Sequence, residues 1–484
     1  MAKNNNRFVV IQRRSPDKAS AAERTRTFAE IYAPFTPTNG QGQSSRCASC
    51  GVPFCQSACP LHNNIPDWLG LAAEGRYEEA WRQSAATSAM PEICGRICPQ
   101  DRLCEGACVL EQSQWDGVTI GSVEKWLGDM AFDNGWVDPI RPAAELGQSV
   151  GIIGAGPAGL AAADRLREMG YQVTVYDRHD RPGGLLIYGI PGFKLEKHAV
   201  ERRTRRLAEG GVRFVMDFEV GRDASLDQLR ADHDAVLIAT GVYAARRLTA
   251  PGAGSQGVHA ALDYLIASNR KGFGDEVPAF EDGRLNAAGR EVVVIGGGDT
   301  AMDCVRTAVR QGASSVVCMY RRDRDNMPGS RREVEHAEEE GVRFEWLAAP
   351  KAVLGDAEHA AGVRGLRQRL GAPDASGRRR VEDTDQEFDL PAGMVIEALG
   401  FEPEDLKAAF EAPDLEVDGY GCVKVAARSQ ATNLPGVFAA GDISRGASLV
   451  VWAVRDGQDA ARDIDLYLQA QAAERAVLLA GAAQ

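Results

Sequence analysis

The chain has 484 residues, of which 44% are hydrophobic and 25% charged, and its formal net charge is -13. This length suggests two or three compact units, and the composition is that of a globular protein without an apolar run long enough to predict a membrane span. The acidic balance does not favour nucleic-acid binding, and the first residues lack the apolar core of a signal peptide. We therefore expect a cytoplasmic protein that binds neither membranes nor nucleic acids.

Eight of the eleven cysteines are crowded into the first 145 residues, where the other segments show helical periodicity. The first run consists of Cys47, Cys50, Cys55 and Cys59, and the second of Cys94, Cys98, Cys104 and Cys108. Such crowding in a cytosolic chain indicates metal ligation rather than disulfides. Zinc is one alternative, but its usual arrangement is two close pairs separated by a long spacer. Because the first run departs from the bacterial ferredoxin pattern only in a wider middle gap, we predict two 4Fe-4S clusters.

The order of the cysteines predicts how the clusters share them. In two-cluster ferredoxins, the cysteine that precedes a proline ligates the other cluster. The same exchange here would group Cys47, Cys50 and Cys55 with Cys108. The second cluster would then take Cys59, Cys98 and Cys104 and would need one more ligand, for which Cys94 is the simplest choice.

From Ser149 the pattern changes to short apolar strands that alternate with longer helices, which predicts a doubly wound parallel sheet. Gly154, Gly156 and Gly159 follow the first strand and open a helix. These glycines permit a tight turn, close approach of a pyrophosphate and helix-to-strand packing. Asp177, at the end of the second strand, can accept hydrogen bonds from ribose hydroxyls, which suits FAD.

A second unit with the same pattern begins near residue 291. Its turn and helix start comprise Gly296, Gly298, Asp299, Thr300 and Ala301. The strand that follows ends in Arg321 and Arg322 without an acidic residue, and two guanidiniums there can bind the 2'-phosphate of NADPH. Arg331 and Arg332 could also reach the phosphate, but they could equally cap or solvate the next helix, and we assign them no role.

Several segments resemble the pyridine-nucleotide-disulphide oxidoreductases, flavoproteins with two nucleotide sites: RPGGLLIYGIPGFKL, LIATG, GGGDTAMD and FAAGDIS. The resemblance implies that Asp442 holds the flavin ribityl chain and that a helix beginning near Leu449 directs its N-terminus at the flavin. The expected FAD site comprises Gly154, Gly156, Pro157, Ala158, Gly159, Asp177, Gly184, Leu185, Gly241, Gly441, Asp442, Leu449 and Val450. The expected NADPH site comprises Gly296, Gly297, Gly298, Asp299, Thr300, Ala301, Arg321 and Arg322. No cysteine lies between Val109 and Asp303, so we do not expect disulfide chemistry.

The N-terminal region is similar to the iron-sulfur domain of dihydropyrimidine dehydrogenase and its relatives, and this similarity implies a non-cysteine cluster ligand at Glu124. Cys94 and Glu124 therefore remain competing candidates. Longer segments resemble the small subunits of bacterial NADPH-dependent glutamate synthases over nearly the whole chain: FAEIYAPF, RCASCGVPFCQSACP, ICGRICPQDRLCEGAC, TIGSVEKW, GIPGFKLEK, GGGDTAMDCVRTAVRQGA and RRDRDNMPGSRREV.

This last resemblance implies an electron-input subunit of a hetero-oligomer. NADPH would reduce FAD, and electrons would pass through the clusters to FMN in a large subunit that makes L-glutamate from L-glutamine and 2-oxoglutarate. Hydride transfer needs the two cofactors held together rather than a catalytic side chain. Two alternatives are the same module serving another complex, such as an NADPH-ferredoxin oxidoreductase, and a non-catalytic iron-sulfur scaffold.

The expected fold class is α/β, with two Rossmann-like nucleotide-binding domains preceded by an α-helical iron-sulfur domain. We predict that residues 1–145 form the iron-sulfur domain, residues 146–245 and 396–484 the FAD domain, and residues 246–395 an NADPH domain inserted in it.

Overall fold

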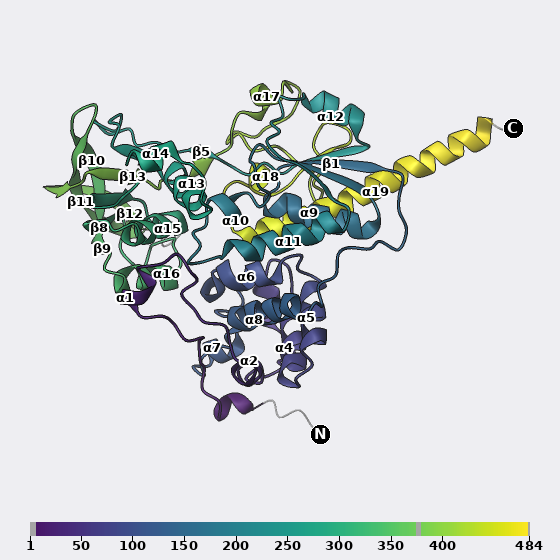
Figure 1. Cartoon of the computed structure of the whole chain (residues 1–484), viewed down its shortest axis with the longest axis horizontal. Coiled ribbons are helices and arrows are strands. Elements are labelled where there is room, and N and C mark those ends of the chain that lie inside the picture. Colours follow the sequence, from purple (N-terminus) through teal and green to yellow (C-terminus); the bar gives the residue numbers. More distant parts are fainter. Residues whose placement is uncertain (1–5, 374–378, 483–484) are drawn as a thin grey trace.

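The computed structural model describes residues 6–373 and 379–482. An N-terminal helical region packs beneath two parallel five-stranded sheets that carry helices on their faces, and two small antiparallel sheets complete the fold (Figure 1). Across these described ranges, no helix combines the length and apolar character that crossing a membrane requires.

The N-terminal region is helical, as its periodicity predicts. Its elements are η1 (Arg7–Val9), α1 (Ala21–Arg24), α2 (Pro37–Ser44), α3 (Phe54–Ala58), α4 (Ile65–Ala73), α5 (Tyr77–Ala85), α6 (Pro91–Ile97), η2 (Gln100–Arg102), α7 (Val109–Gln112) and α8 (Ile120–Asp133). Gly75, with a φ of +79°, separates α4 from α5. Helices α6 and α8 approach so closely that only a glycine fits at residue 95: a Cβ there would lie 2.5 Å from the main-chain nitrogen of Lys125. This approach brings Cys98, which follows α6, close to Glu124 on α8.

The first parallel sheet has the order β15-β4-β1-β2-β3. Its strands are β1 (Ser149–Ile153), β2 (Gln172–Tyr176), β3 (Arg213–Val215), β4 (Ala235–Ile238) and β15 (Val437–Ala439). The accompanying helices are α9 (Pro157–Met169), α10 (Leu185–Tyr188), α11 (Lys197–Glu209), α12 (Leu226–Asp232), α17 (Leu406–Ala409), α18 (Asp442–Arg445) and α19 (Val450–Ala482). Strand β15 therefore returns to this sheet from the far end of the chain.

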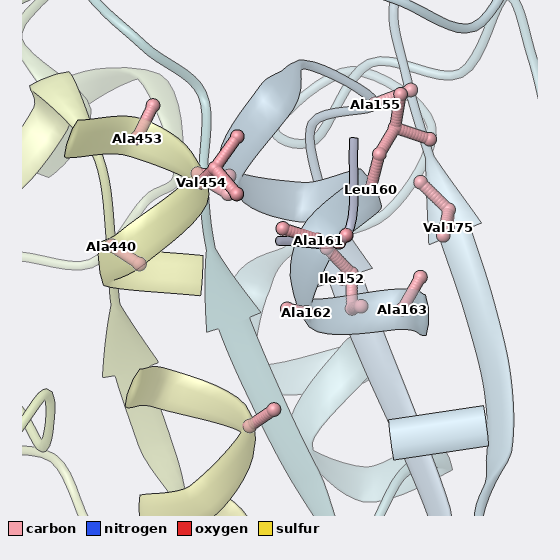
Figure 2. Close-up of a cluster of buried hydrophobic side chains, with 14 of the residues drawn as sticks. Ile152, Ala155, Leu160, Ala161, Ala162, Ala163, Val175, Ala440, Ala453 and Val454 are labelled. Atoms are coloured by element: carbon pink, nitrogen blue, oxygen red, sulfur yellow. The ribbon is translucent and has the colours of Figure 1, made fainter. Parts of the chain in front are cut away.

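The core of this unit consists of small side chains between β1, α9 and α19. Figure 2 shows Ala161, Ala162 and Ala163 of α9 near Ile152 of β1, and all four are fully buried. Burying this apolar surface provides much of the stabilisation, at about 25 cal/mol per Å². The two helices touch because α19 presents Gly457, where a Cβ would lie 2.1 Å from a carbonyl oxygen of α9.

The second parallel sheet has the order β6-β13-β7-β8-β9. Its strands are β6 (Val258–Ala260), β7 (Glu291–Ile295), β8 (Ser315–Tyr320), β9 (Arg343–Trp346) and β13 (Met394–Glu397), and its helices are α13 (Ala261–Gly272), α14 (Pro278–Glu281), α15 (Asp299–Arg310) and α16 (Arg331–Glu339). The division predicted between residues 395 and 396 falls inside β13, which pairs with β6 and β7. We therefore place this boundary after β13. The short strands β5 (Ala244–Ala245) and β14 (Phe401–Glu402) pair where the chain crosses between the units.

A three-stranded antiparallel sheet extends the second unit. Its strands are β10 (Ala348–Gly355), β11 (Ala360–Pro373) and β12 (Arg379–Pro391). The sequence suggests only a variable hydrophilic stretch at residues 370–388, yet its described part is largely strand. The hydrophilic side chains remain exposed and pair across the strands, as Arg364 does with Asp389 and Arg369 with Glu382, both at 2.8 Å.

A buried ion cluster joins the N-terminal segment to α15 and α16. Glu340 accepts hydrogen bonds from Arg24 at 2.8 Å, from Arg306 at 2.8 Å and from Arg310 at 2.6 Å. Burial alone would raise the pKa of Glu340, but the hydrogen bonds from Arg310 and Arg306 outweigh it and lower the pKa to about 2. A second buried pair, Arg203 with Glu92 at 2.7 Å, joins α11 to α6. The three parts of the chain are thus held together by charges as well as by apolar contacts.

Candidate functional site

A cavity of about 240 Å³ lies at the carboxyl ends of the strands of the first sheet, where ligands bind in doubly wound folds. Most of the residues predicted for FAD line it: Gly154, Gly156, Pro157, Ala158, Asp177, Leu185, Gly241, Asp442, Leu449 and Val450. Of the other three, Gly184 and Gly441 lie against this wall, because a Cβ on either would come within 2.9 Å of Gly156 or Ala158. The structure therefore brings residues from four separate segments to one cavity.

The first glycine turn has the geometry that a bound pyrophosphate requires. Gly154 has a φ of +108°, and a Cβ there would lie 2.3 Å from the carbonyl oxygen of Ala239. A Cβ on Gly159 would lie 1.9 Å from the carbonyl oxygen of Gly154, so the helix can pack here only on a glycine. Nothing lies within 4 Å of the corresponding position on Gly156. The backbone at Gly156 is therefore open to close approach by a ligand.

Two carboxyl groups face the same cavity. Asp177 accepts hydrogen bonds from the main-chain nitrogens of Ala155 at 2.7 Å and His179 at 2.8 Å, which fix it against the glycine turn. Burial raises the pKa of Asp442 to about 7, so this carboxyl can donate or accept a hydrogen bond near neutral pH. Leu449 and Val450 place the positive N-terminal end of α19 on the cavity wall. These groups fit the hydroxyls and the electron-accepting ring of FAD.

The second glycine turn repeats this geometry at the end of β7. Gly296 has a φ of +149°, and a Cβ there would lie 2.2 Å from a carbonyl oxygen at the end of β13. Gly298 has open space at its Cβ position, and Ala301 is fully buried where the first turn has its third glycine. Asp299 and Thr300 line the first cavity together with the residues predicted for FAD. The two nucleotide motifs therefore meet at one cavity.

Arg321 and Arg322 follow β8, beside Gly297, whose Cβ would lie 2.3 Å from the ring of Tyr320. Within the described residues neither guanidinium has a carboxylate partner, and Nε of Arg322 is buried without a hydrogen bond. Such unpaired guanidiniums fit a phosphate. Neither of them lines the first cavity, so both lie outside the part of the site that the two glycine turns share.

Four thiols of the N-terminal region surround a small cavity, and they are Cys47, Cys50, Cys55 and Cys108. Burial raises the pKa of Cys47 to about 11 and that of Cys55 to about 12, and the neighbouring cysteines add to both shifts. The cavity holds about 20 Å³, roughly one water molecule. In the described part of the chain no three or more His, Cys, Asp or Glu side chains are arranged to hold a single metal ion. The fit to a cluster therefore rests on the donor set, four thiols among apolar walls.

A second group of thiols lies between this cavity and the flavin cavity. Cys59 and Cys98 end α3 and α6 with extended backbone because a proline follows each of them. Burial raises the pKa of Cys104 well above its ordinary value, and Glu105, Glu124 and Cys59 add to the shift. Cys98 also lines the flavin cavity. This residue therefore belongs to the surroundings of both candidate sites.

The two competing ligands both lie next to the second group. Glu124 accepts hydrogen bonds from Ser84 Oγ at 3.3 Å and from Asn63 Nδ2 at 3.4 Å, and burial raises its pKa to about 8. Cys94 is buried on α6, and the hydroxyl of Ser88 lies 4.0 Å from its sulfur. The hydrogen-bond partners of Glu124 are neutral, so no cation compensates the buried carboxylate directly.

The structure also reveals site residues that the sequence analysis did not single out. Lys194 Nζ lies 2.8 Å from Asp303 Oδ1, and both side chains line the flavin cavity between the two glycine turns. Tyr243 lines the same wall. Lys194 and Asp303 lie within the quoted segments GIPGFKL and GGGDTAMD, but they are more than a hundred residues apart in the chain. No local pattern could have paired them.

Comparison with known proteins agrees with this arrangement. Residues 148–457 match the family described as pyridine nucleotide-disulphide oxidoreductase, and residues 24–136 match that described as dihydropyrimidine dehydrogenase domain II, 4Fe-4S cluster. Mycobacterium tuberculosis FprA in complex with NADPH shares the fold, with a TM-score of 0.57 at 21% identity over 69% of this chain and 86% of that chain. Fold and sites therefore define a pyridine-nucleotide flavoprotein joined to a 4Fe-4S domain, and the expected FAD, NADPH and 4Fe-4S cofactors are confirmed.

Two relatives identify the family within this class. The glutamate synthase (NADPH) small chain of Azospirillum brasilense is 62% identical over 466 residues, which cover 96% of each chain. The protein of the same name from Escherichia coli K12 is 45% identical over 476 residues, which cover 97% of this chain and all of that one. The chain belongs to the family of NADPH-dependent glutamate synthase small chains, as the sequence resemblance predicts.

Proposed function

We propose that this chain oxidises NADPH at FAD and passes the electrons through two iron-sulfur clusters to FMN in a large glutamate synthase subunit, which makes L-glutamate from L-glutamine and 2-oxoglutarate. The observation that carries this proposal is the position of Cys98, which lines the flavin cavity and lies among the thiols of the second group. In this proposal NADPH, bound at the second glycine turn, gives electrons to the flavin, and the cluster that Cys98 ligates accepts them from the flavin. The names of the relatives support the identity of the final acceptor.

In this proposal the chain's own residues bind and orient rather than react. When bound, FAD accepts a hydride from NADPH and releases single electrons. The two glycine turns hold the pyrophosphates, Asp177 holds the FAD ribose, and Arg321 with Arg322 select the 2'-phosphate. The buried pair of Lys194 and Asp303 lies between the two turns and excludes water from that part of the cavity.

We further propose that the two clusters interleave along the chain. One would be held by the four thiols around the small cavity, and the other by Cys59, Cys98, Cys104 and Glu124. The support for Glu124 over Cys94 is its buried carboxyl group: its described hydrogen bonds come only from neutral groups, so it ionises at neutral pH only when a cation such as cluster iron binds it.

Replacing these two residues separately tests the fourth ligand. Glu124→Ala is expected to lower the iron content or to change the electron paramagnetic resonance of one cluster, whereas Cys94→Ala should leave both signals intact. Flavin content serves as the control for folding in both variants. Full retention of both signals in the Glu124 variant, with loss in the Cys94 variant, would assign the site to Cys94 instead.

Two measurements test the function itself. Anaerobic NADPH added to the purified chain should bleach its flavin absorbance, and absence of bleaching would contradict the enzyme proposal. A pull-down from the source cells should recover a large FMN protein, and the complex should oxidise NADPH in a reaction that depends on glutamine and 2-oxoglutarate. Recovery of a different flavoprotein without that activity would assign the chain to another complex.

A further inference from the structure

A second cavity, of about 720 Å³, adjoins the flavin cavity. Its walls come from the N-terminal segment, from the iron-sulfur domain around η2, and from the loop and first turns of α16. The two cavities share four lining residues, which are Arg96, Lys194, Arg332 and Glu333. These four side chains therefore mark the passage between the second cavity and the flavin.

Most cations along this passage are already bound to carboxylates. Arg96 lies 2.6 Å from Glu30, and Lys194 lies 2.8 Å from Asp303. Arg332 differs, because its nearest carboxylate, that of Glu333, is 3.9 Å from its Nε. That carboxylate is itself bound by a buried arginine of α15 at 2.5 Å. The guanidinium of Arg332, about 40% exposed, thus keeps its hydrogen-bond donors free within the described structure.

The surroundings of Arg332 favour an anion. The main-chain nitrogen of Ser330 donates to Asp299 Oδ1 at 2.9 Å, which ties the start of α16 to the start of α15. Thr300 lines the flavin cavity with Arg332. The carboxylate of Asp299 thus already caps α16, and what remains beside the second glycine turn is the N-terminus of α15 and the free guanidinium of Arg332, both of which attract negative charge. A planar guanidinium binds two phosphate oxygens at once.

We propose that Arg332 binds the phosphate of NADPH that is attached to the nicotinamide ribose, and thereby positions the nicotinamide half at the flavin cavity. This inference rests on the proposed function, since it assigns a further residue to the same NADPH site. Arg321 and Arg322 would then bind the 2'-phosphate at the adenosine end of NADPH, and Arg332 would bind the phosphate at the nicotinamide end.

The test compares two ligands on the full flavin-loaded chain. NADP⁺ contains both phosphates of the bridge, whereas 2',5'-ADP has the 2'-phosphate but lacks the nicotinamide-side phosphate. Arg332→Gln is expected to weaken NADP⁺ binding about tenfold, or about 1.4 kcal/mol, and to leave 2',5'-ADP binding unchanged. Arg331→Gln is the matched control, because Arg331 is the exposed neighbour that lines only the second cavity, and it should affect neither ligand. Arg322→Gln should weaken both.

Three further readouts keep the proposal falsifiable. Arg332→Lys, which keeps the charge but not the planar fork, should bind NADP⁺ with intermediate affinity, and this variant decides the matter if the glutamine variant does not fold. Unchanged NADP⁺ affinity in either Arg332 variant, or equal weakening of both ligands, would overturn the assignment. Equal effects of the Arg331 and Arg332 substitutions would also overturn it. Failure of the proposed function looks different, because the unaltered chain would then neither bind NADP⁺ nor be bleached by NADPH.

Discussion

Replacing Glu340 by glutamine is expected to loosen α15 and α16, the helices that carry the second glycine turn and Arg332. The carboxylate is fully buried and is bound by three arginines. Its pKa falls from an ordinary value of 4.5 to about 2, a difference worth about 3 kcal/mol. Removing one partner of a buried ion pair costs about 3–5 kcal/mol. We therefore expect Glu340→Gln to lower the free energy of unfolding of this unit by about 3 kcal/mol at neutral pH.

The neighbouring residue provides the matched control. Glu339 binds Lys18 and Arg24, each at 2.6 Å, but its side chain is 45% exposed, and solvent screens such pairs. We expect Glu339→Gln to cost less than about 1 kcal/mol. Hydrogen exchange of the amides in α15 and α16, measured by mass spectrometry, reports on this unit without requiring the whole chain to unfold at once. Protection should fall about a hundredfold for Glu340→Gln and less than about fivefold for Glu339→Gln.

The same carboxylate predicts a pH dependence with a definite sign. The folded-state pKa of Glu340 is lowered, so its contribution to the free energy of unfolding is fully present above about pH 4.5. This stabilisation is lost as the pH falls from about 4.5 to about 2. The exchange difference between Glu340→Gln and the unaltered chain should therefore narrow over that range. Equal and small effects of the two glutamine variants at neutral pH would refute the reasoning.

Two further predictions concern the nucleotide turns. Gly159→Ala should lower both the FAD content and the melting temperature of the flavin-free chain, because its Cβ would lie 1.9 Å from a carbonyl oxygen. Gly156→Ala, with open space at that position, should lose FAD but keep the melting temperature of the flavin-free chain. Thermal unfolding and flavin absorbance measure both, and equal melting temperatures would contradict the packing argument. Replacing Arg321 and Arg322 by glutamine should raise the KM for NADPH about tenfold and leave that for NADH unchanged, because only NADPH carries the 2'-phosphate. A parallel rise for both coenzymes would show that these arginines do not recognise that group.

Local patterns allowed the two glycine turns to be predicted from the sequence. The tight approach at Gly154, the open space at Gly156 and the packing at Gly159 each depend on a few neighbouring residues, and the structure has the expected geometry at all three. The grouping of Cys47, Cys50 and Cys55 with Cys108 was also accessible from the Cys-Pro steps, by comparison with two-cluster ferredoxins, and the ligation of one cluster by these four thiols stays a prediction. The four thiols grouped by that argument are those that line the small cavity.

What the sequence could not provide depends on long-range contact. The hydrophilic stretch around residues 370–388 gave no strand signal, because its described strand residues are mostly exposed and show no apolar alternation. Arg332 was indistinguishable from Arg331, since only the fold directs one of them to the passage and the other to solvent. The boundary set at residue 396 was misplaced within β13, because a short apolar strand fits either parallel sheet equally well.

The final helix has a consequence for how the protein matures. Its first turn closes the flavin cavity, and two turns later Arg455 and Gln458 donate hydrogen bonds to the carbonyl oxygens of Pro60 and Thr87 in the iron-sulfur domain, at 2.9 Å and 3.0 Å. Helix α19 stays packed on the first unit as far as Leu468, which is fully buried, and only its last turns project from the body of the molecule (Figure 1). Domains fold from the N-terminus during synthesis, but in this chain the flavin site is completed, and fastened to the iron-sulfur domain, only by α19, which follows the first glycine turn by most of two domains. Flavin loading must therefore wait until α19 has been made, and a nascent chain arrested before α19 would contain all eight N-terminal cysteines but lack the wall that α19 adds to the flavin cavity.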